Sequence, residues 1–462
     1  MRVLVVGGGI SGLSAAYRLR QSGCEVVVLE ADDRPGGKIR SELSDGYLVE
    51  HGPNGFLDSR TAVIDLVGEL GLEGQLLPAN EEAARRYVFS RGWLRALPRG
   101  PLSLIVSGLL TPRGLLRLLC EPFIKARLAD TSTGKSDESV FDFAKRRIGR
   151  EAAEVLVDAM VSGIYAGDAR HLSLASAFPK MATFESTYGG LVKALYHLMK
   201  GRKVGTSAAA GPGGRLTSFP GGLEVLVKAL ARQLEGQVLC GRRAVSLERG
   251  QGTLRVVTDG KAGLETFEAE RVVLALPAES FATLLGPHSE RGALALRQIP
   301  YASAAVVALG YPLGTLPRPL DGFGFLVPGV ESRRILGSVF CSTLFPGRAA
   351  RGRVLMRAIL GGVRHPELLG QDDTSLLALT RSELDITMGG PMPDSVFQRV
   401  IRWPAAIPQY DVGHAGRVAA IEAALSELPG VFSASNAMYG VSLADCVARA
   451  VALPPLVNRP LA

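Results

Sequence analysis

A glycine-rich turn near the start of the chain is the first feature whose residue types and spacing point to chemistry. Residues 2–30 read RVLVVGGGISGLSAAYRLRQSGCEVVVLE: an apolar run, a glycine turn, a helical pattern and a second apolar run. We expect Gly7 to make the tight turn, Gly9 to let the backbone approach a pyrophosphate, and Gly12 to let the helix pack closely on the strand. The phosphates would lie at the helix N-terminus, where Ile10 stands.

The second apolar run ends in an acid. Glu30 stands where a carboxylate can accept hydrogen bonds from the ribose hydroxyls. Ser11, near the pyrophosphate, and Ala31, next to the ribose acid, complete the expected contacts of this unit. Because strand, glycines, helix and acid follow one another in this order, the sequence predicts a Rossmann unit that binds a dinucleotide.

The next segment favours a flavin over a nicotinamide. Residues 31–56 read ADDRPGGKIRSELSDGYLVEHGPNGF, with a second glycine pair flanked by cations that suit a diphosphate. Nicotinamide enzymes do not need this second turn. The segment resembles the FAD signature of the amine oxidase and phytoene desaturase superfamily, in which the second glycine turn meets the diphosphate and a GPN turn borders the isoalloxazine. The FAD contacts that this resemblance implies are Arg34, Gly36, Gly37, Lys38, Gly52, Pro53 and Asn54.

A strand, a glycine turn and a helix also follow one another near the C-terminus, in GVFSASNAMYGVSLADCVARAVAL. In the superfamily this turn places its N–H groups against the flavin pyrimidine ring and the diphosphate. The resemblance implies flavin contacts at Val441, Ser442 and Leu443. Two residues depart from the pattern: Ser435 stands where a glycine is usual, and Ala444 where a polar residue is common.

The length and patterning of the chain predict more than one domain. At 462 residues the chain exceeds the roughly 250–300 residues that one core usually supports. Helical periodicity dominates residues 60–200, a Gly- and Ala-rich basic loop follows at 200–214, and strand patterns fill 300–400. We expect an α/β fold with a Rossmann-type FAD-binding domain, an antiparallel-sheet substrate domain, and an inserted all-helical, membrane-facing domain. The expected segments are 1–85, 214–285 and 413–462 for the FAD-binding domain, 86–213 for the helical domain, and 286–412 for the substrate-binding domain.

Six segments in the same order resemble the protoporphyrinogen and coproporphyrinogen III oxidase family over essentially the whole chain. They are GPNGFLDSR (52–60), RRYVFSRGWLRALP (85–98), SGIYAGDARHLSLASAFP (162–179), DGFGFLVPG (321–329), RWPAAIPQYDVGH (402–414) and NAMYGVSLADC (436–446). The resemblance implies that Trp403 approaches the flavin and that Val245 packs near the adenine. We expect Tyr410 and His414 to fix the start of the last FAD segment rather than to do chemistry.

The same resemblance implies the substrate contacts. Arg86 matches the arginine that pairs with a substrate propionate, and a guanidinium fork suits that task because it holds a carboxylate in two parallel bonds. Apolar positions that sandwich the tetrapyrrole and glycines that let the backbone approach it complete the set, namely Gly324, Leu326, Ile359, Gly163 and Gly167.

The implied reaction is the six-electron oxidation of a porphyrinogen to a porphyrin in haem biosynthesis, with dioxygen as final acceptor and hydrogen peroxide as by-product. A pyrrole nitrogen can push a hydride from a meso carbon to flavin N5, so no acid or base is assigned; what the protein supplies is position. The six histidines and five cysteines show no metal or nucleophile motif, and no metal is expected.

The choice of substrate stays open at this point. Leu326, Ile359 and the apolar segment 102–124 favour protoporphyrinogen IX, with coproporphyrinogen III as the alternative. An amine- or carotenoid-type oxidase of the same superfamily and a non-catalytic porphyrin carrier are the competing interpretations. Ser435 is the feature that favours a carrier.

The expected location is the cytoplasm, because the N-terminal apolar run leads directly into the glycine turn and no secretory signal is evident. Residues 95–127 mix Leu and Ile with Arg and Lys, which suits either a peripheral contact with the inner face of the cell membrane or a helical core with snorkelling arginines. A net charge of +8 suits anionic ligands, whereas no basic run interleaved with aromatics favours nucleic acid. A homodimer stays open.

Overall fold

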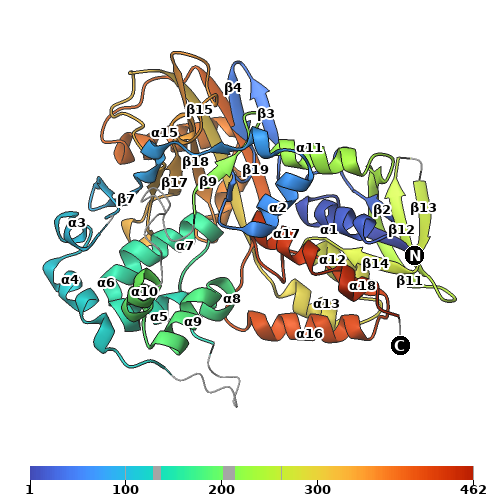
Figure 1. Cartoon of the computed structure of the whole chain (residues 1–462). Coiled ribbons are helices and arrows are strands. Elements are labelled where there is room, and N and C mark those ends of the chain that lie inside the picture. Colours follow the sequence, from blue (N-terminus) through green and yellow to red (C-terminus); the bar gives the residue numbers. More distant parts are fainter. Residues whose placement is uncertain (99, 128–136, 201–213, 262, 461–462) are drawn as a thin grey trace.

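The structure is a computed structural model that describes residues 1–98, 100–127, 137–200, 214–261 and 263–460 (Figure 1). The loop expected at 200–214 lies outside the described residues except for its two ends. A parallel sheet with its helices occupies the right of the view, a larger sheet the upper part, and a helical segment the left.

The chain begins with the expected Rossmann unit, whose two strands belong to a larger parallel sheet. A five-stranded parallel sheet has the order β10-β2-β1-β14-β20, with β1 and β2 paired along their full length. Its central strands are buried on both faces, which is why RVLVV and EVVVL read as continuous apolar runs. The bounds are β1 Arg2–Val6, β2 Glu25–Leu29, β10 Val238–Leu239, β14 Arg271–Leu274 and β20 Val431–Ser433.

Helices cover both faces of the parallel sheet, as in doubly wound folds. One face packs against α1 (Ile10–Gln21), α2 (Thr61–Glu69), α11 (Glu224–Gln233), α17 (Leu443–Val451) and α18 (Pro454–Val457). The other face packs against α12 (Ala278–Leu285), α13 (Glu290–Arg297), α16 (His414–Ser426) and an antiparallel sheet of β11 (Arg242–Arg249), β12 (Leu254–Gly260) and β13 (Gly263–Ala269). The predicted α/β class is thus confirmed.

The second large sheet has seven strands in the order β19-β15-β18-β17-β16-β7-β8. All its neighbours are antiparallel except β16 and β7, which run parallel, so the sheet is mixed rather than purely antiparallel. The bounds are β7 Tyr87–Ser90, β8 Trp93–Ala96, β15 Tyr301–Pro312, β16 Gly324–Leu326, β17 Ile335–Val339, β18 Arg353–Gly361 and β19 Phe397–Pro408. Helix α15 (Asp373–Thr387) packs against one face.

The hairpin of β7 and β8 comes from a region that the sequence assigned to the helical domain. Arg91 and Gly92, with φ of 54° and 80°, form the two-residue loop, and two left-handed residues match the twist of a hairpin. The strands extend the seven-stranded sheet because Tyr87 pairs with Phe325, more than two hundred residues away. The expected domain boundary between residues 85 and 86 therefore assigns β7 and β8 to a different domain from the sheet that they extend.

Two small sheets connect these parts. The hairpin of β3 (Ser41–Ser44) and β4 (Tyr47–Glu50) follows the second glycine turn, and β9 (Leu216–Ser218) lies between β5 (Phe56–Leu57) and β6 (Leu77–Pro78). The remaining short elements are α14 (Cys341–Leu344) and the turns η1 (Glu73–Gln75), η2 (Glu81–Ala84), η5 (Gly329–Glu331) and η6 (Pro366–Gly370).

The described residues between 101 and 200, namely 101–127 and 137–200, are mostly helical and are called here the helical segment. It contains α3 (Pro101–Val106), α4 (Pro112–Leu119), η3 (Glu121–Phe123), α5 (Val140–Ile148), α6 (Arg150–Ala152), η4 (Ala153–Val157), α7 (Asp158–Tyr165), α8 (Leu174–Ala177), α9 (Pro179–Tyr188) and α10 (Leu191–Lys200). Among the described residues, no helix is both long and apolar enough to cross a bilayer.

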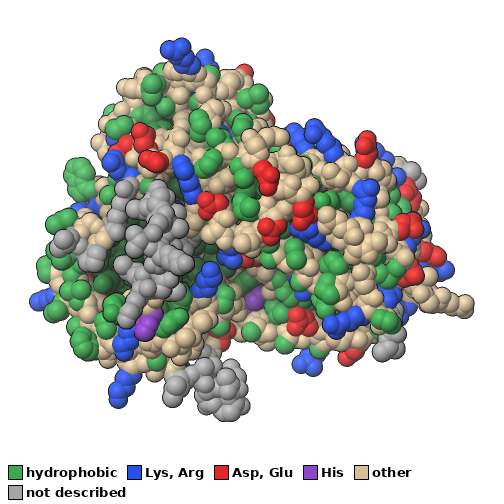
Figure 2. All heavy atoms as spheres, viewed as in Figure 1, with side chains coloured by type: hydrophobic (Ala, Val, Ile, Leu, Met, Phe, Trp, Pro, Cys, Tyr) green, Lys and Arg blue, Asp and Glu red, His purple; other side chains and the backbone are tan. Residues whose placement is uncertain are grey.

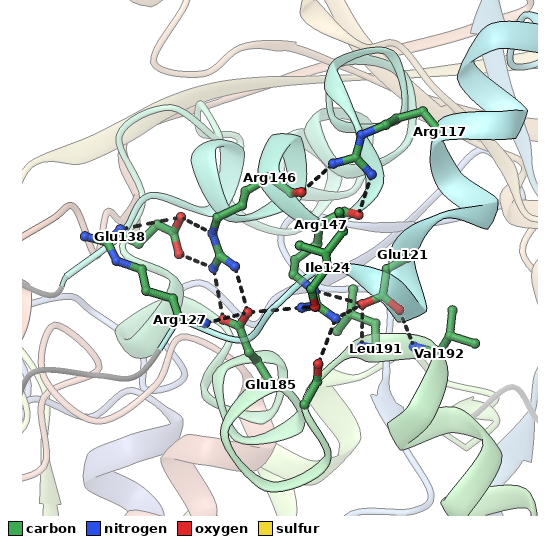
Figure 3. A network of polar contacts seen from close by, with 11 residues as sticks. Arg117, Glu121, Ile124, Arg127, Glu138, Arg146, Arg147, Glu185, Leu191 and Val192 are labelled. Atoms are coloured by element: carbon green, nitrogen blue, oxygen red, sulfur yellow. Dashed lines mark hydrogen bonds and ion pairs between the residues drawn. The ribbon is translucent and has the colours of Figure 1, made fainter.

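A buried network of charges holds this segment together (Figure 3). The side chains of Arg147 and Glu121 are fully buried, and the Arg147 Nε donates to a Glu121 oxygen at 2.8 Å. Glu121 also accepts from the backbone amides of Leu191 and Val192, at 2.8 and 3.1 Å. Because these amides lie at the start of α10, the Glu121 carboxylate joins η3, α5 and α10. Glu185 pairs with both Arg146 and Arg147.

Replacing Glu121 with Gln should destabilise the helical segment by about 3 kcal/mol, because the buried charge of Arg147 would lose its nearer carboxylate and keep only the longer contact with Glu185. Urea unfolding and hydrogen exchange of the α10 amides would measure the loss. Glu154→Gln is the matched control, since Glu154 pairs with the exposed Arg150. Equal effects of the two substitutions would contradict the assigned role of the network.

Candidate active site

The first glycine turn has the shape that a dinucleotide requires. Gly7 has φ of +105°, and a Cβ placed there would lie 2.5 Å from the Ala275 carbonyl oxygen. A Cβ at Gly12 would collide with the carbonyl of Gly7, so the helix can approach the strand only without a side chain. At Gly9, by contrast, no atom lies within 4 Å of such a Cβ. The space beside Gly9 is therefore open to a pyrophosphate.

Glu30 lies at the carboxyl end of β2, facing this turn. Its carboxylate is buried and accepts hydrogen bonds from the backbone amides of Gly8 at 2.5 Å and Asp32 at 2.8 Å. Burial raises the pKa of Glu30 above its ordinary value, although these amides oppose the effect. Ala31, half-buried, follows directly. The acid predicted to bind ribose is thus fixed at the mouth of the glycine turn.

The second glycine turn lies against the first. The Gly36 amide donates to the Gly8 carbonyl at 2.8 Å, and a Cβ on Gly37 would lie 3.5 Å from the Cα of Gly9. Arg34 does not extend towards open space: its guanidinium donates to the Gly37 carbonyl at 3.3 Å and lies 3.6 Å from Glu224. These contacts stabilise the turn. A contact between Arg34 and a diphosphate stays a prediction.

Lys38 is the cation that the same turn leaves free. Among the residues that the structure describes, Lys38 makes no hydrogen bond or ion pair, and its Nζ lies 5.7 Å from the centre of the Tyr301 ring. Burial lowers the pKa of Lys38 to about 8. A half-buried cation without an anion, beside two glycine turns, fits the diphosphate of a dinucleotide.

The third turn, Gly52 to Asn54, is held by the seven-stranded sheet. Arg357, buried in the middle of β18, donates to the Asn54 side-chain oxygen at 2.5 Å and to the Gly52 carbonyl at 2.9 Å. The Trp403 indole donates to the carbonyl of His51, at 2.8 Å, while Pro53 is exposed. Trp403 thus lies beside the GPN turn, where the resemblance puts the isoalloxazine.

Sequence reasoning missed Arg357. Burial lowers the pKa of its guanidinium below the ordinary value, so its charge is stabilised mainly by the oxygens that it binds. A signal was available: an arginine stands in the centre of the apolar run RVLMRAILGG, whose other inner residues pack in the core. A charge in such a strand needs a specific partner.

The last predicted FAD segment is fixed by IPQYDVGH. The Tyr410 hydroxyl donates to the Asn436 carbonyl at 2.5 Å and accepts from the Gly440 amide at 2.8 Å. Its ring stacks on His414 at 4.0 Å between centroids, and its carbonyl accepts from Ser173 in the helical segment. Tyr410 and His414 therefore lie between two parts of the chain, in the structural role that the sequence suggested.

The start of α17 follows this segment. Ser442 caps the helix, accepting from the Asp445 amide at 3.1 Å; Leu443 is buried in the core beside α1, and Val441 packs against the helical segment. Ser435 has a structural use, because its hydroxyl donates to the Leu276 carbonyl at 2.5 Å. Its presence in place of glycine is thus explained by closure of the turn, and Ala444 is simply buried beside Leu443.

Three residues form a row across the seven-stranded sheet, called here the apolar row: Leu326, Gly337 and Ile359. Gly337 pairs with Leu326 on one side and with Ile359 on the other. Directly paired residues point to the same face of an antiparallel sheet, so two apolar side chains flank a position without one. A Cβ at Gly337 would collide with the Phe325 carbonyl, which explains the glycine that sequence reasoning missed.

The other predicted substrate residues surround this row. Gly163 of α7 packs on Leu326, since a Cβ there would lie 2.7 Å from a Leu326 methyl group. Gly324, with φ of +137°, begins the strand that carries Leu326. Gly167 does not contact Leu326. It lies against Gln409, in the turn YAGD at residues 165–168.

Arg86 and Val245 lie further out. The Arg86 guanidinium lies 5.3 Å from the centre of the Phe323 ring. Arg86 is exposed overall, although partial desolvation of its guanidinium lowers the pKa of this group. Val245 is 38% exposed in the bulge of β11, three residues after Arg242, whose amide donates to the Glu30 carbonyl at 2.7 Å. Val245 thus lies on a strand that begins beside Glu30, and its contact with adenine stays a prediction.

Comparison with known proteins identifies the family. The model of the flavin containing amine oxidoreductases matches residues 10–452. The chain belongs to this family. FAD is therefore its cofactor, the chain is an FAD-dependent oxidoreductase, and the glycine turns, Glu30 and the unpaired Lys38 are consistent with that cofactor.

Several curated relatives are porphyrinogen oxidases, in line with the resemblance seen in the sequence. The chloroplastic protoporphyrinogen oxidase of Nicotiana tabacum is 31% identical, over 96% of this chain and 83% of that protein. The coproporphyrinogen III oxidase of Bacillus subtilis (strain 168) is 29% identical, over 96% of this chain and 95% of its own. A crystal structure from Exiguobacterium sp. 255-15, assigned as a protoporphyrinogen oxidase, has a TM-score of 0.83 at 25% identity and covers 99% and 98% of the two chains.

Replacing Arg357 with Leu should loosen FAD, because the Gly52 carbonyl and the Asn54 side chain would lose a buried donor worth about 1–3 kcal/mol. We expect about a tenfold rise in the dissociation constant of FAD, measured by fluorescence titration of the apoprotein. Arg353→Leu, at the exposed start of the same strand, is the control. Equal FAD affinity in the two variants would contradict the role given to Arg357.

Acid should destabilise the protein through His414. Burial, helped by Arg417 and opposed by Asp137, lowers the pKa of His414 to about 4, so the folded state holds the ring neutral. Because the unfolded ring takes up a proton near its ordinary pKa of 6.5, the stability that depends on His414 is complete above that pH. It is lost as the pH falls from 6.5 to 4, by about 3 kcal/mol at ~1.36 kcal/mol per pH unit.

Denaturant titrations across this pH range would test the effect. His414→Phe keeps a ring on Tyr410 and should flatten the slope, whereas His365→Phe, at a half-exposed site, should keep the wild-type slope. A wild-type slope in His414→Phe would show that other groups control the acid sensitivity.

Proposed function

We propose that the chain oxidises protoporphyrinogen IX to protoporphyrin IX in haem biosynthesis, removing six electrons and using dioxygen, with hydrogen peroxide as by-product. The observation that carries the proposal is the apolar row, whose Ile359 packs against the same apolar cluster as Trp403. Arg86 stands two residues before Val88, which pairs with Leu326 of the row. The names of the curated relatives support the substrate class.

The chain's own contribution is position. The apolar row offers a flat surface on which a tetrapyrrole can lie, and Gly163 brings α7 against Leu326 to limit the space on that side. Bound FAD supplies the hydride acceptor and returns to the oxidised form with dioxygen. Trp403 and Arg357 hold the GPN turn rigid against the sheet, so that the substrate surface and the cofactor segment keep a fixed relation.

Arg86 is suited to the carboxylate edge of the substrate. Its guanidinium has no ion pair within the described residues, whereas the neighbouring Arg85 is paired with Asp321. A partly desolvated cation without an anion gains most from a carboxylate that arrives with the substrate. Since the pyrrole nitrogens supply the electron push, no residue is assigned as an acid or a base.

Coproporphyrinogen III is the second candidate substrate. The coproporphyrinogen III oxidase of Bacillus subtilis (strain 168), 29% identical to this chain, supports this alternative. Coproporphyrinogen has four propionates and protoporphyrinogen has two. The number of cations around the row is therefore the structural property that distinguishes the two substrates.

A peripheral membrane contact through the helical segment is part of the proposal, with a cytoplasmic location; a homodimer stays a prediction. Leu116 and Leu119 of α4 and Phe123 of η3 are 65%, 62% and 86% exposed. Figure 2 shows hydrophobic side chains over α3 and α4, at the left of the view, with Lys and Arg among them. An exposed apolar surface with basic neighbours suits the headgroup region of a bilayer.

The direct test supplies protoporphyrinogen IX and coproporphyrinogen III separately, in air, and follows porphyrin fluorescence above the rate of auto-oxidation. Faster turnover of protoporphyrinogen IX is expected. Preference for coproporphyrinogen III would reverse the choice of substrate, and activity on neither by FAD-loaded protein would refute the proposal.

Arg86→Ala should raise KM for the porphyrinogen about tenfold or more while changing kcat much less, because a lost charged hydrogen bond weakens binding by about 1.5–3 kcal/mol. Steady-state kinetics would measure both constants. Arg85→Ala, which removes the adjacent arginine paired with Asp321, should leave KM near the wild-type value. An unchanged KM in Arg86→Ala would remove this residue from the site.

A further inference from the structure

A small cavity beside Arg86 contains a second arginine. The cavity has a volume of about 30 Å³ and is lined by residues 79–86, by the segment 214–216, and by Phe323. Arg86 and Arg215 both line it, although they are more than a hundred residues apart in the chain. About 10–15 Å³ suffices for one water molecule, so the space accommodates a group about as large as a carboxylate.

Arg215 is anchored at one end and free at the other. Its Nε donates to the Ala79 carbonyl at 2.6 Å, and its backbone amide donates to Asp58 at 2.8 Å. The two terminal nitrogens of its guanidinium make no hydrogen bond or ion pair in the part of the chain that the structure describes. The stem is therefore held in place while two donors remain unused.

The acids nearby do not neutralise this pair of arginines. Asp321 binds Arg85 and Tyr87, and Asp58 accepts a hydrogen bond from the backbone amide of Arg215. Glu81 lines the cavity and is exposed, but forms no ion pair with Arg86 or Arg215. Two guanidinium groups around a space of this size favour an incoming anion, and guanidinium geometry matches a carboxylate.

The cavity also adjoins the surface assigned to the tetrapyrrole. Phe323 and Leu216, which line the cavity, pack in the same apolar cluster as Ile359 and Trp403. A planar substrate on the apolar row would therefore have an edge towards the two arginines. Since this cluster joins Ile359 of the row to the cavity wall, a single ligand can contact both.

We propose that Arg215 is a second substrate-binding residue, and that Arg86 and Arg215 each hold one of two propionates on neighbouring rings of the tetrapyrrole: one carboxylate enters the cavity beside Arg215, and the other binds on the solvent-exposed side of Arg86. This inference rests on the proposed function and deepens it, because it specifies two cations at one edge of the substrate. A substrate that lacks either carboxylate should then bind more weakly than one that has both.

The first experiment needs no variant. The FAD-loaded protein is titrated with protoporphyrin IX, with each of its two monomethyl ester isomers, and with the dimethyl ester, while porphyrin fluorescence is followed. Both monoesters should bind about tenfold more weakly than the diacid, and the diester more weakly still. If one monoester binds as tightly as the diacid, a single arginine holds a single carboxylate and the inference is wrong.

The second experiment uses Arg215→Gln, which removes the charge but keeps a donor for the Ala79 carbonyl. We expect about tenfold weaker binding of the diacid, unchanged binding of the dimethyl ester, a raised KM for the porphyrinogen, and little change in kcat. Arg215→Lys should recover part of the loss, and Arg232→Gln, on the exposed side of α11, serves as the control. Equal losses for diacid and diester would mean that the effect is structural and would overturn the inference.

The two proposals fail in different ways. Porphyrinogen oxidation by the wild type together with wild-type binding in Arg215→Gln would refute only the role of Arg215. Absence of oxidation and of porphyrin binding in FAD-loaded wild type would refute the proposed function itself.

Discussion

The hydrogen bond from the Gly36 amide to the Gly8 carbonyl is the contact on which the rest of the site depends. It brings the second glycine turn against the first, and this is sterically allowed because neither turn carries a side chain at the point of approach. From there the chain runs through Lys38 and the hairpin of β3 and β4 to the turn at Gly52. This backbone contact thus joins the first two of the three segments that the cofactor requires, and the chain leads from them to the third.

The remaining parts of the chain reach this site through buried polar contacts. Arg357 and Trp403 join the GPN turn to the seven-stranded sheet, and Tyr410 joins the last segment to the helical one. Such contacts are directional, and each leaves an unpaired buried group if broken, so they fix a geometry that apolar packing alone would not. A reaction that needs no strong acid or base depends on this kind of accuracy.

The sequence predicts a structure most reliably where the residues that form it are close together in the chain. The strand, glycines, helix and acid of residues 2–30 predicted the Rossmann unit correctly, because each part lies within one turn or strand of the next. Arg34 was placed in the correct turn, but its observed bonds are to the backbone of that turn. Local spacing fixes the position of a residue more firmly than the direction of a long side chain.

Features that depend on distant pairing were not predictable in the same way. The row of Leu326, Gly337 and Ile359 exists because three strands pair in one register, and the hairpin at 87–96 joins that sheet through a parallel contact with β16. Gly337 and Arg215 carry no local motif, and only the fold shows what each of them adjoins. Arg357 is the intermediate case, since a charge inside an apolar strand is visible in the sequence but its partner is not.

We propose that the apolar row presents a porphyrinogen, and not an amine, to the flavin. The most direct measurement is the flavin absorbance of the FAD-loaded protein, mixed without oxygen with protoporphyrinogen IX, coproporphyrinogen III or putrescine. We expect a porphyrinogen to bleach the oxidised flavin band rapidly, delivering two electrons per flavin, with porphyrin fluorescence developing only after oxygen is admitted to complete the six-electron oxidation, and we expect no bleaching by the amine. Bleaching by putrescine alone, or porphyrin formation without loss of the flavin band, would contradict the proposal.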